Sequence, residues 1–313
     1  MNLRKNRVKW TDEKLERVAH YTILGFTARE VADKLTTEFS ETYDTGTVQR
    51  AKDRRPEIRH LIEKESSDNI TYYKARTLPM EDYTVMCDAH SPFHSEVMIN
   101  RAIMMSAKFG IKKLIFIGDA FDFSFAKHWL SDDNYTMDQE GDLCKSFVQA
   151  LSYFDKIYLC RGNHEYRVNR LTDGKIVSGV IVKALSGDTW AGKLEYSGYD
   201  RMYVGDFNGI DDPGYMMVHP KSYSQVSPAV ARRLAEKFHR HIINSHGHLL
   251  GFSADRSGKF MAVDLGGMFD TNKIEYISKH TTTHPTWING FGMLLNGKFH
   301  HFHKFTDFGY WGV

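Results

Sequence analysis

The spacing of apolar residues changes near residue 76, and this change divides the chain into two parts. Within residues 1–76, apolar side chains recur at helical spacing, most clearly over 28–35. Thr27 and Glu30 form a capping-box pattern directly before that segment. We therefore predict a small all-α domain over 1–76, with helices beginning near residues 11, 27, 47 and 58, and with a polar turn at 40–46.

Beyond residue 76 the pattern changes to short apolar strands that alternate with helices. Residues 66–82 are mostly polar and predict a linker. The strands are expected at 83–87, 113–117, 156–160, 215–218 and 241–244, and the helices at 96–109, 138–154 and 228–239. Asn296-Gly297 predicts a hairpin within the aromatic-rich residues 286–313. We assign residues 77–313 to one domain of the α/β (α+β) class.

The composition narrows the classes of function. With 313 residues, of which 42% are hydrophobic, the chain can bury a large core, and its formal charge of +2 indicates no electrostatic partner for the whole chain. It contains no run of about 18 apolar residues, so we expect no membrane partner. No apolar stretch follows the charged residues 1–7, which argues against a signal peptide. Three cysteines without metal-type spacing predict reduced thiols and a cytoplasmic protein.

Five short motifs of histidine and carboxylate residues follow the predicted strands, each just past a strand's carboxyl end. They are Asp88-Ala-His90, Gly118-Asp119-Ala-Phe-Asp122, Gly162-Asn163-His164-Glu165, His219 and His246-Gly-His248. Open α/β sheets bind their ligands at that edge. Taken singly, an Asp-X-His pair is more often a surface turn, and His219 before Pro220 could be an ordinary buried histidine. Their order and their shared position after strands favour a metal site.

In this combination the motifs resemble those of the calcineurin-like metallophosphoesterase superfamily, over about residues 83–270. The resemblance implies a four-layer β-sandwich flanked by helices and a centre for two divalent metal ions. It also implies which residues bind these ions. Asp88, His90 and His248 would bind the first metal, and Asp119 would bridge both metals. Asn163, His219 and His246 would bind the second metal.

The ligand types agree with this implication. Mixed carboxylate, amide and imidazole ligands suit Mn²⁺, which we expect, or Fe or Zn²⁺, better than Mg²⁺ or Ca²⁺. Two such ions about 3.5–4 Å apart clamp a phosphate and activate a water molecule to attack it. By the family pattern His164 protonates the leaving group or stabilises charge on it, and Asp122 orients His164. Arg161 is expected to contact phosphate. His94 is a candidate substrate contact, with a solvated loop histidine as the alternative.

Some residues depart from the family pattern. The last motif reads Ser-His-Gly-His where Gly-His-Thr-His is usual. We prefer the register that keeps His246 and His248, which strand alternation would place on one side; the register Gly247-His248 would lose one ligand. Phe123 follows Asp122 where Ser/Thr protein phosphatases have Arg-Gly, which argues against that class. The run over residues 88–94 looks more like phosphoesterases of phages and bacteria.

Residues 11–62 resemble a helix-turn-helix module, with 27–37 as its second helix and about 45–55 as its reading helix. The candidate contacts to nucleic acid are Arg50, Lys52, Arg54 and Arg55. Arginine can read guanine edges and lysine can hold phosphates. However, the net charge of residues 1–76 is only about +3, which is weak for a DNA-binding domain. A loop over 38–46 would be longer than the usual turn, so a winged or degenerate module, a helical cap and a protein-docking bundle stay open.

Three functions compete on these observations. The first is a two-metal phosphoesterase that cleaves phosphodiester bonds in nucleic acid, with DNA as the expected substrate and the N-terminal helices as its guide. The second is a phosphomonoesterase or small cyclic-nucleotide phosphodiesterase, whose N-terminal helices serve oligomerisation. The third is a DNA-binding protein with an inactive phosphoesterase domain, which the full ligand set disfavours. The sequence predicts no oligomeric state.

Overall fold

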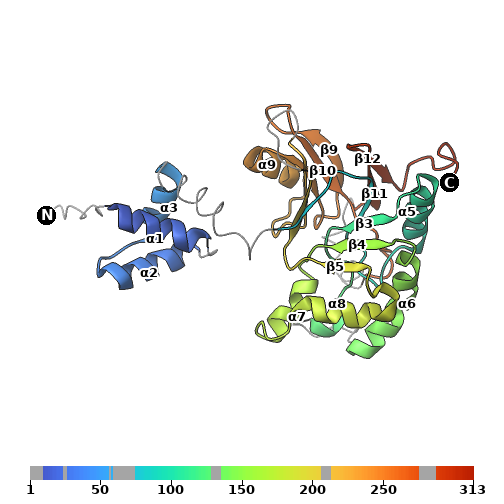
Figure 1. Cartoon of the computed structure of the whole chain (residues 1–313), viewed down its shortest axis with the longest axis horizontal. Helices are drawn as coiled ribbons and strands as arrows, with labels where there is room; N and C mark the ends of the chain where they lie inside the picture. Colours follow the sequence, from blue (N-terminus) through green and yellow to red (C-terminus); the bar gives the residue numbers. More distant parts are fainter. Residues whose placement is uncertain are drawn as a thin grey trace. The chain divides into compact units, whose positions relative to one another are not determined.

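The computed structural model describes residues 10–23, 27–55, 58, 75–127, 135–205, 213–274 and 287–313. The chain divides into two compact units, Met1–Lys74 and Ala75–Val313 (Figure 1). The predicted boundary, between residues 76 and 77, lies two residues further along the chain. The predicted linker was wrong at residues 77–78, which form a short strand; the rest of it up to residue 74 and nearly all of the fourth predicted helix lie outside the described residues.

The N-terminal unit contains three described helices, α1(Asp12–Ile23), α2(Ala28–Phe39) and α3(Thr45–Arg54). Thr27 and Glu30 form the predicted capping box at the start of α2. The Asp44 side chain accepts a hydrogen bond from the Thr47 amide, so α3 begins two residues before the predicted residue 47. The connection between α2 and α3 is therefore residues 40–44, shorter than the loop expected over 38–46. Val18, Val31, Leu35 and Val48 are among the buried residues of its core.

The C-terminal unit contains two mixed sheets of six strands each. The first sheet has the order β12(Lys298–His303), β11(Gly290–Leu295), β2(Tyr83–Met86), β3(Lys113–Phe116), β4(Lys156–Leu159), β5(Leu194–Tyr196). The second has the order β1(Thr77–Leu78), β6(Arg201–Val204), β7(Tyr215–Val218), β8(His241–Asn244), β10(Met261–Leu265), β9(Leu250–Ala254). The hairpin predicted at Asn296-Gly297 is confirmed, because Leu295 pairs with Lys298 across β11 and β12.

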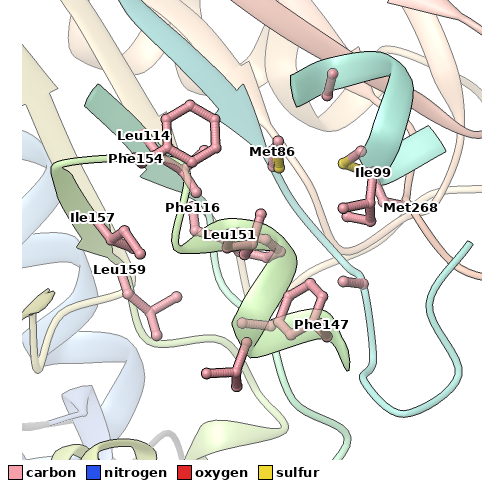
Figure 2. Close-up of a cluster of buried hydrophobic side chains, with 14 of the residues drawn as sticks. Met86, Ile99, Leu114, Phe116, Phe147, Leu151, Phe154, Ile157, Leu159 and Met268 are labelled. Carbon is pink, nitrogen blue, oxygen red and sulfur yellow. The ribbon is translucent and has the colours of Figure 1, made fainter. Parts of the chain in front are cut away.

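Helices cover the outer face of each sheet. They are α5(Glu96–Lys108), α6(Met137–Leu151), α7(Glu165–Leu171), α8(Ser178–Ser186) and α9(Ala229–Phe238), with 3₁₀ turns η1(Ser124–Ala126) and η2(Gly187–Trp190). Leu114 and Phe116 of β3 pack in one cluster with Phe147 and Leu151 of α6 (Figure 2). Ile115, between them on the other face of β3, packs instead with residues of the second sheet.

Four layers result from this alternation. Helices α5 and α6 pack on the first sheet, the first sheet packs on the second, and α9 packs on the second through Ala231 and Ala235. This is the expected α/β architecture of a two-sheet sandwich flanked by helices. Strand β3 is covered on both faces, which explains why its sequence is a continuous apolar run.

The arrangement brings several strand ends to one region. Strands β2, β3 and β4 are parallel neighbours in the first sheet, and β7, β8 and β10 are parallel neighbours in the second. The carboxyl ends of parallel neighbours lie on the same edge of a sheet, and most of the predicted motifs follow these strands directly. Among the described helices, none is both long and apolar enough to cross a membrane.

Candidate metal centre

The loops that carry the first two motifs are joined to each other through their backbones. The Asp88 amide donates to the Gly118 carbonyl at 3.1 Å, and the His90 amide donates to the Asp119 carbonyl at 3.0 Å. Gly118 has φ +72°, and a Cβ there would lie 2.7 Å from both the Gly162 Cα and the His219 ring. Glycine is therefore required where three of the motif loops meet.

Five of the predicted metal ligands have backbones in the left-handed region. These residues are Asp88, His90, Asp119, His246 and His248, with φ between 47° and 76°. Non-glycine residues rarely adopt this conformation, and each instance costs on the order of 1–3 kcal/mol. Strand alternation was therefore the wrong reason to expect His246 and His248 on one side. They lie in the loop between β8 and β9, and it is this loop that directs both side chains to the centre.

One group of side chains converges at the first predicted metal position. Asp88, His90 and His248 are all buried and each can offer one ligand atom to a common point. The Nε2 atoms of His90 and His248 lie 3.1 Å apart, and the Asp88 Oδ1 lies 3.2 Å from the His248 Nε2. The His246 amide donates to the Asp88 Oδ2 at 3.1 Å, which ties a loop of the second sheet to a loop of the first.

A second group converges at the other predicted position. It contains Asp119, His219 and His246, and the Asn163 Oδ1 lies 2.8 Å from the His219 Nε2. The His219 Nδ1 donates to the Ile117 carbonyl at 3.1 Å, which leaves its Nε2 to face the group. Such a hydrogen bond sets the tautomer and the orientation of a ligating histidine.

Asp119 belongs to both groups by position. Its Oδ1 accepts from the His164 amide at 2.8 Å. Its Oδ2 lies 3.3 Å from the His219 Nε2 and 4.0 Å from the His90 Nε2, and it is buried without a hydrogen-bond partner in the described part of the chain. A buried, unpaired carboxylate oxygen is costly, and a pair of divalent cations beside it would satisfy it. The residues present therefore fit two metal ions that share Asp119.

The electrostatics of these groups also fit cations. Burial, reinforced by neighbouring histidines, lowers the pKa of His90 and of His246 to about 3, so both imidazoles are neutral near pH 7 and keep a lone pair for a metal. Burial, reinforced by the charge of Asp88, raises the pKa of Asp119 to about 6. Burial alone would also raise the pKa of Asp88, but the hydrogen bond from His248 and the charges of His248, His219 and His90 together outweigh it and lower that pKa. A bound cation would favour the ionised form of both carboxyls.

His164 and Asp122, the predicted catalytic pair, lie beside these groups. The His164 Nδ1 is 3.0 Å from the Asp122 Oδ1 and 2.9 Å from the Asp122 carbonyl oxygen, so its proton points at Asp122. The Ser124 Oγ donates to the Asp122 Oδ2 at 2.5 Å. Burial would raise the pKa of Asp122, but His164 and Arg167 hold it well below its usual range. Asp122 is thus a fixed anion that orients the His164 ring.

Two residues to which the sequence assigned no role complete the surroundings. Buried Glu165 accepts hydrogen bonds from the amides of Asp119 at 2.8 Å, Ala120 at 2.9 Å and Gly162 at 2.8 Å, and so holds the Asp119 loop. Arg167 donates to the Asp122 carbonyl at 2.7 Å and its Nη2 lies 2.9 Å from the His164 Nε2. Arg167 stands three residues after His164 on a helix, and that spacing was the available signal.

The two predicted substrate contacts, Arg161 and His94, both have aromatic neighbours. The Arg161 guanidinium lies 4.7 Å from the centroid of the Tyr166 ring. His94 is buried, with its ring 5.1 Å from that of Phe147, so the alternative of a solvated loop histidine was wrong. His94 packs into the core beneath α6, and this burial lowers the pKa of His94 to about 4.

The basic residues predicted to contact nucleic acid lie on or next to α3 in the N-terminal unit. Arg50 is exposed and donates to the Thr47 Oγ1 at 3.1 Å, and Lys52 is half-buried. The Arg55 guanidinium lies 6.0 Å from the Trp10 ring centroid. The side chain of Arg54 is outside the described residues.

Comparisons with known proteins give loose structural likenesses. No protein-family model matches the sequence, and no curated protein matches it. Similar solved structures include the phosphoesterase YfcE from E. coli, with TM-score 0.32 and 12% identity over 69% of this chain and 89% of that one. Vacuolar Protein Sorting 29 from Cryptosporidium parvum has TM-score 0.35 and 11% identity over 72% and 96%. A dimetal phosphatase from Danio rerio also has TM-score 0.35 and 11% identity over 72% and 96%. The geometry of the site therefore has to support any function by itself.

Proposed function

We propose that this chain is a two-metal phosphoesterase of the calcineurin-like metallophosphoesterase superfamily. The observation that supports this most directly is the Asp119 Oδ2, which is buried, unpaired among the described residues and placed between two convergent ligand groups. A single carboxylate in that position can serve two metal ions at once. The motif order seen in the sequence and the two-sheet architecture agree with this proposal.

In the proposed hydrolysis the metal ligands and the pair of His164 and Asp122 have different roles. Two bound divalent ions would supply Lewis acidity and lower the pKa of a water molecule, and Mn²⁺ suits the mixed ligands best, with Fe or Zn²⁺ as alternatives. His164 would protonate the leaving oxygen or stabilise its charge, with Asp122 holding the ring. The His164 Nε2 faces Arg167, so it can carry a proton to substrate only when Arg167 moves from Nε2 to a substrate oxygen. We therefore also propose that Arg167 binds an oxygen of the substrate phosphate.

Hydrolysis of bis-p-nitrophenyl phosphate with Mn²⁺ tests this function. We expect turnover by the wild type and a loss of at least about 100-fold for Asp119→Asn. The loss for His164→Ala on this ester should be smaller, because p-nitrophenolate is a good leaving group. His20→Ala is the matched control, because it removes an imidazole from the N-terminal unit. Absence of turnover with every divalent ion and ester tested would contradict the proposal and favour the inactive-domain alternative.

The finer part of the proposal is that the substrate is a phosphodiester in nucleic acid, with DNA expected. Helix α3 supports it, because Val48 and Ala51 are buried in the N-terminal core while Gln49 and Arg50 are exposed on its other side. A helix that presents an arginine and an amide in this way can contact base edges and phosphates. The N-terminal unit would then guide the substrate.

Charge removal on α3 tests this finer part. We expect Arg50→Ala combined with Lys52→Ala to weaken DNA binding and to flatten its dependence on salt, since each lost phosphate contact lowers the slope by about 0.9. Cleavage of DNA should fall more than hydrolysis of bis-p-nitrophenyl phosphate. Lys145→Ala on α6 combined with Lys183→Ala on α8 is the control, because it removes two positive charges from exposed positions of the other unit. Equal effects on both substrates would favour a phosphomonoesterase or small phosphodiesterase.

A further inference from the structure

Three aromatic side chains of the described residues contact the metal-ligand histidines, and the proposed chemistry uses none of them. Phe269 is fully buried, with its ring centroid 4.7 Å from that of His248. The Tyr223 ring centroid lies 6.3 Å from that of His246, with the planes at 81°. The Trp287 ring centroid lies 4.6 Å from that of His248, with the planes at 83°. His246 belongs to the second ligand group and His248 to the first, so each group has an aromatic neighbour.

Tyr223 and Trp287 differ in their surroundings. Trp287 is half-buried and packs against Phe269, with ring centroids 5.3 Å apart. Tyr223 is 70% exposed although it adjoins a ligand that is itself largely buried. A single exposed aromatic residue is ordinary on a protein surface. What distinguishes Tyr223 is its position, because its ring is open to solvent at the rim of a polar centre.

The loop that carries Tyr223 is anchored at both of its ends. It begins directly after His219, a member of the second ligand group, and ends where the Ser227 Oγ donates to the Asp264 Oδ2 at 2.8 Å. Asp264 is a buried residue of β10. Residues 220–228 contain Lys221 and no acidic residue, so the loop presents no charge that would repel a phosphate. Tyr223 is therefore held close to the centre on a loop compatible with an anionic ligand.

Cationic side chains lie on the His164 side of the centre. The Arg167 and Lys127 nitrogens are 3.5 Å and 3.4 Å from the Asp122 Oδ2, and their side chains are only 11% and 10% exposed. Both side chains place positive charge beside Asp122 and His164, on the side where the leaving oxygen would be protonated. Exposed aromatic rings combined with a basic groove are the pattern by which proteins bind unpaired nucleotides, since each base can stack on a ring.

We propose that Tyr223 is a stacking platform for the nucleobase next to the scissile phosphate, and that the substrate is a nucleotide strand whose bases are unpaired at this point. The inference rests on the proposed phosphodiesterase function and narrows its substrate. A base is joined to its phosphate through one sugar, so a base whose phosphate lies at the centre can reach a ring that contacts His246. A base inside a continuous duplex is stacked on its neighbours and is not available to Tyr223.

The test compares two single-stranded oligodeoxynucleotides that differ only in their bases. One carries a normal base on each side of the cleaved bond, and the other carries a tetrahydrofuran residue there, which lacks the base. Stacking of one base is worth about 1–3 kcal/mol, so Tyr223→Ala should lower kcat/KM on the normal strand roughly 5- to 150-fold. Its loss on the abasic strand should be at least fivefold smaller. Tyr223→Phe keeps the ring and should keep most of the activity.

Tyr310→Ala is the matched control, because Tyr310 is 84% exposed and lies near the C-terminus. It should cleave both strands at the wild-type rate. Equal losses for Tyr223→Ala on the two strands, or no loss on either, would overturn the stacking platform while leaving the phosphoesterase in place. If the wild-type protein hydrolyses bis-p-nitrophenyl phosphate but cleaves neither strand, the substrate is not an unpaired nucleotide strand, and the stacking proposal is overturned. Failure to hydrolyse any ester would overturn the proposed function itself.

Discussion

The Nε2 atoms of His90 and His248 lie 3.1 Å apart although 158 residues separate them in the sequence. Each ring stands on a residue with positive φ, and both rings are buried. Asp88 faces the same point with its Oδ1 at 3.2 Å from the His248 Nε2. Three buried ligand atoms that converge from two sheets on one point are hard to explain by packing alone, and several consequences can be measured.

Metal binding should stabilise the fold. A ligand that binds only the folded state adds about 2.7 kcal/mol at 100 times its dissociation constant. We therefore expect the Tm of the wild type to rise with Mn²⁺ and to fall after treatment with EDTA. Asp88→Asn should reduce this dependence strongly, whereas the exposed variant Asp142→Asn should retain it. A Tm that does not change with divalent ions would contradict the metal centre, and this result would not depend on measuring activity.

The importance of His164 should depend on the leaving group. A proton donor is most useful when the departing oxygen is a poor leaving group, and general acid catalysis contributes about 10²- to 10⁴-fold. His164→Ala should therefore lose much more activity on an alkyl phosphodiester than on p-nitrophenyl esters. The measurement is kcat/KM across a series of leaving groups. An equal loss across the series would show that His164 does not donate the proton.

Asp122 should act through His164. Replacing an outer carboxylate that orients such a group typically costs about 10- to 100-fold. We expect Asp122→Asn to lower kcat within this range and to add little further loss in a His164→Ala background, because both changes remove one unit. Independent, multiplicative losses in the double variant would instead assign Asp122 a separate role.

Gly162 should tolerate no side chain. A Cβ there would overlap the Asp119 Oδ1 and the Asp119 backbone nitrogen, and it would lie 2.7 Å from the Glu165 Oε2. Gly162→Ala should therefore displace Asp119, lower the metal content of the purified protein and lower the Tm. Gly198→Ala is the control, because a Cβ at Gly198 meets nothing within 4 Å among the described residues. A Gly162→Ala protein with wild-type metal content would contradict this geometry.

Glu140 should make stability depend on pH. It is buried on α6 and accepts from the Phe125 amide at 3.2 Å. Burial, reinforced by the charge of Asp122, raises its pKa from 4.5 to about 7. A raised folded-state pKa means that the stabilising contribution is present below about pH 4.5 and is lost as the pH rises through about 7, by on the order of 3 kcal/mol.

Glu140→Gln keeps the oxygen that accepts from Phe125 and removes the charge. Its Tm should exceed that of the wild type at pH 8 and approach it at pH 4.5, with the concentration of divalent ion held constant. The surface variant Asp142→Asn should follow the wild-type pH profile. Identical profiles for Glu140→Gln and the wild type would show that Glu140 is ionised at little cost in the fold.

Local sequence was enough to predict the elements that place the ligands. Strands such as β3 are buried on both faces, so a short continuous apolar run marks them, and a polar ligand directly after the run marks the strand end. Strand β9 was missed for the opposite reason. It is an edge strand in which no residue is fully buried, so its sequence resembles that of a loop, and only its pairing with β10 identifies it as a strand. Strands β5, β6 and β10 and helices α7 and α8 were also not predicted.

By itself the sequence determined which residue types follow which strands, and hence the class of centre they can form. Only the tertiary structure decided that the Asp119 Oδ2 stays unpaired between two ligand groups of the described chain, that Arg167 lies against His164, and that Tyr223 stands at the rim. The physical reason is that strand and helix patterns depend on neighbours within a few residues. The contacts of these three side chains depend instead on how two sheets pack and how loops between them bend, which no local spacing records.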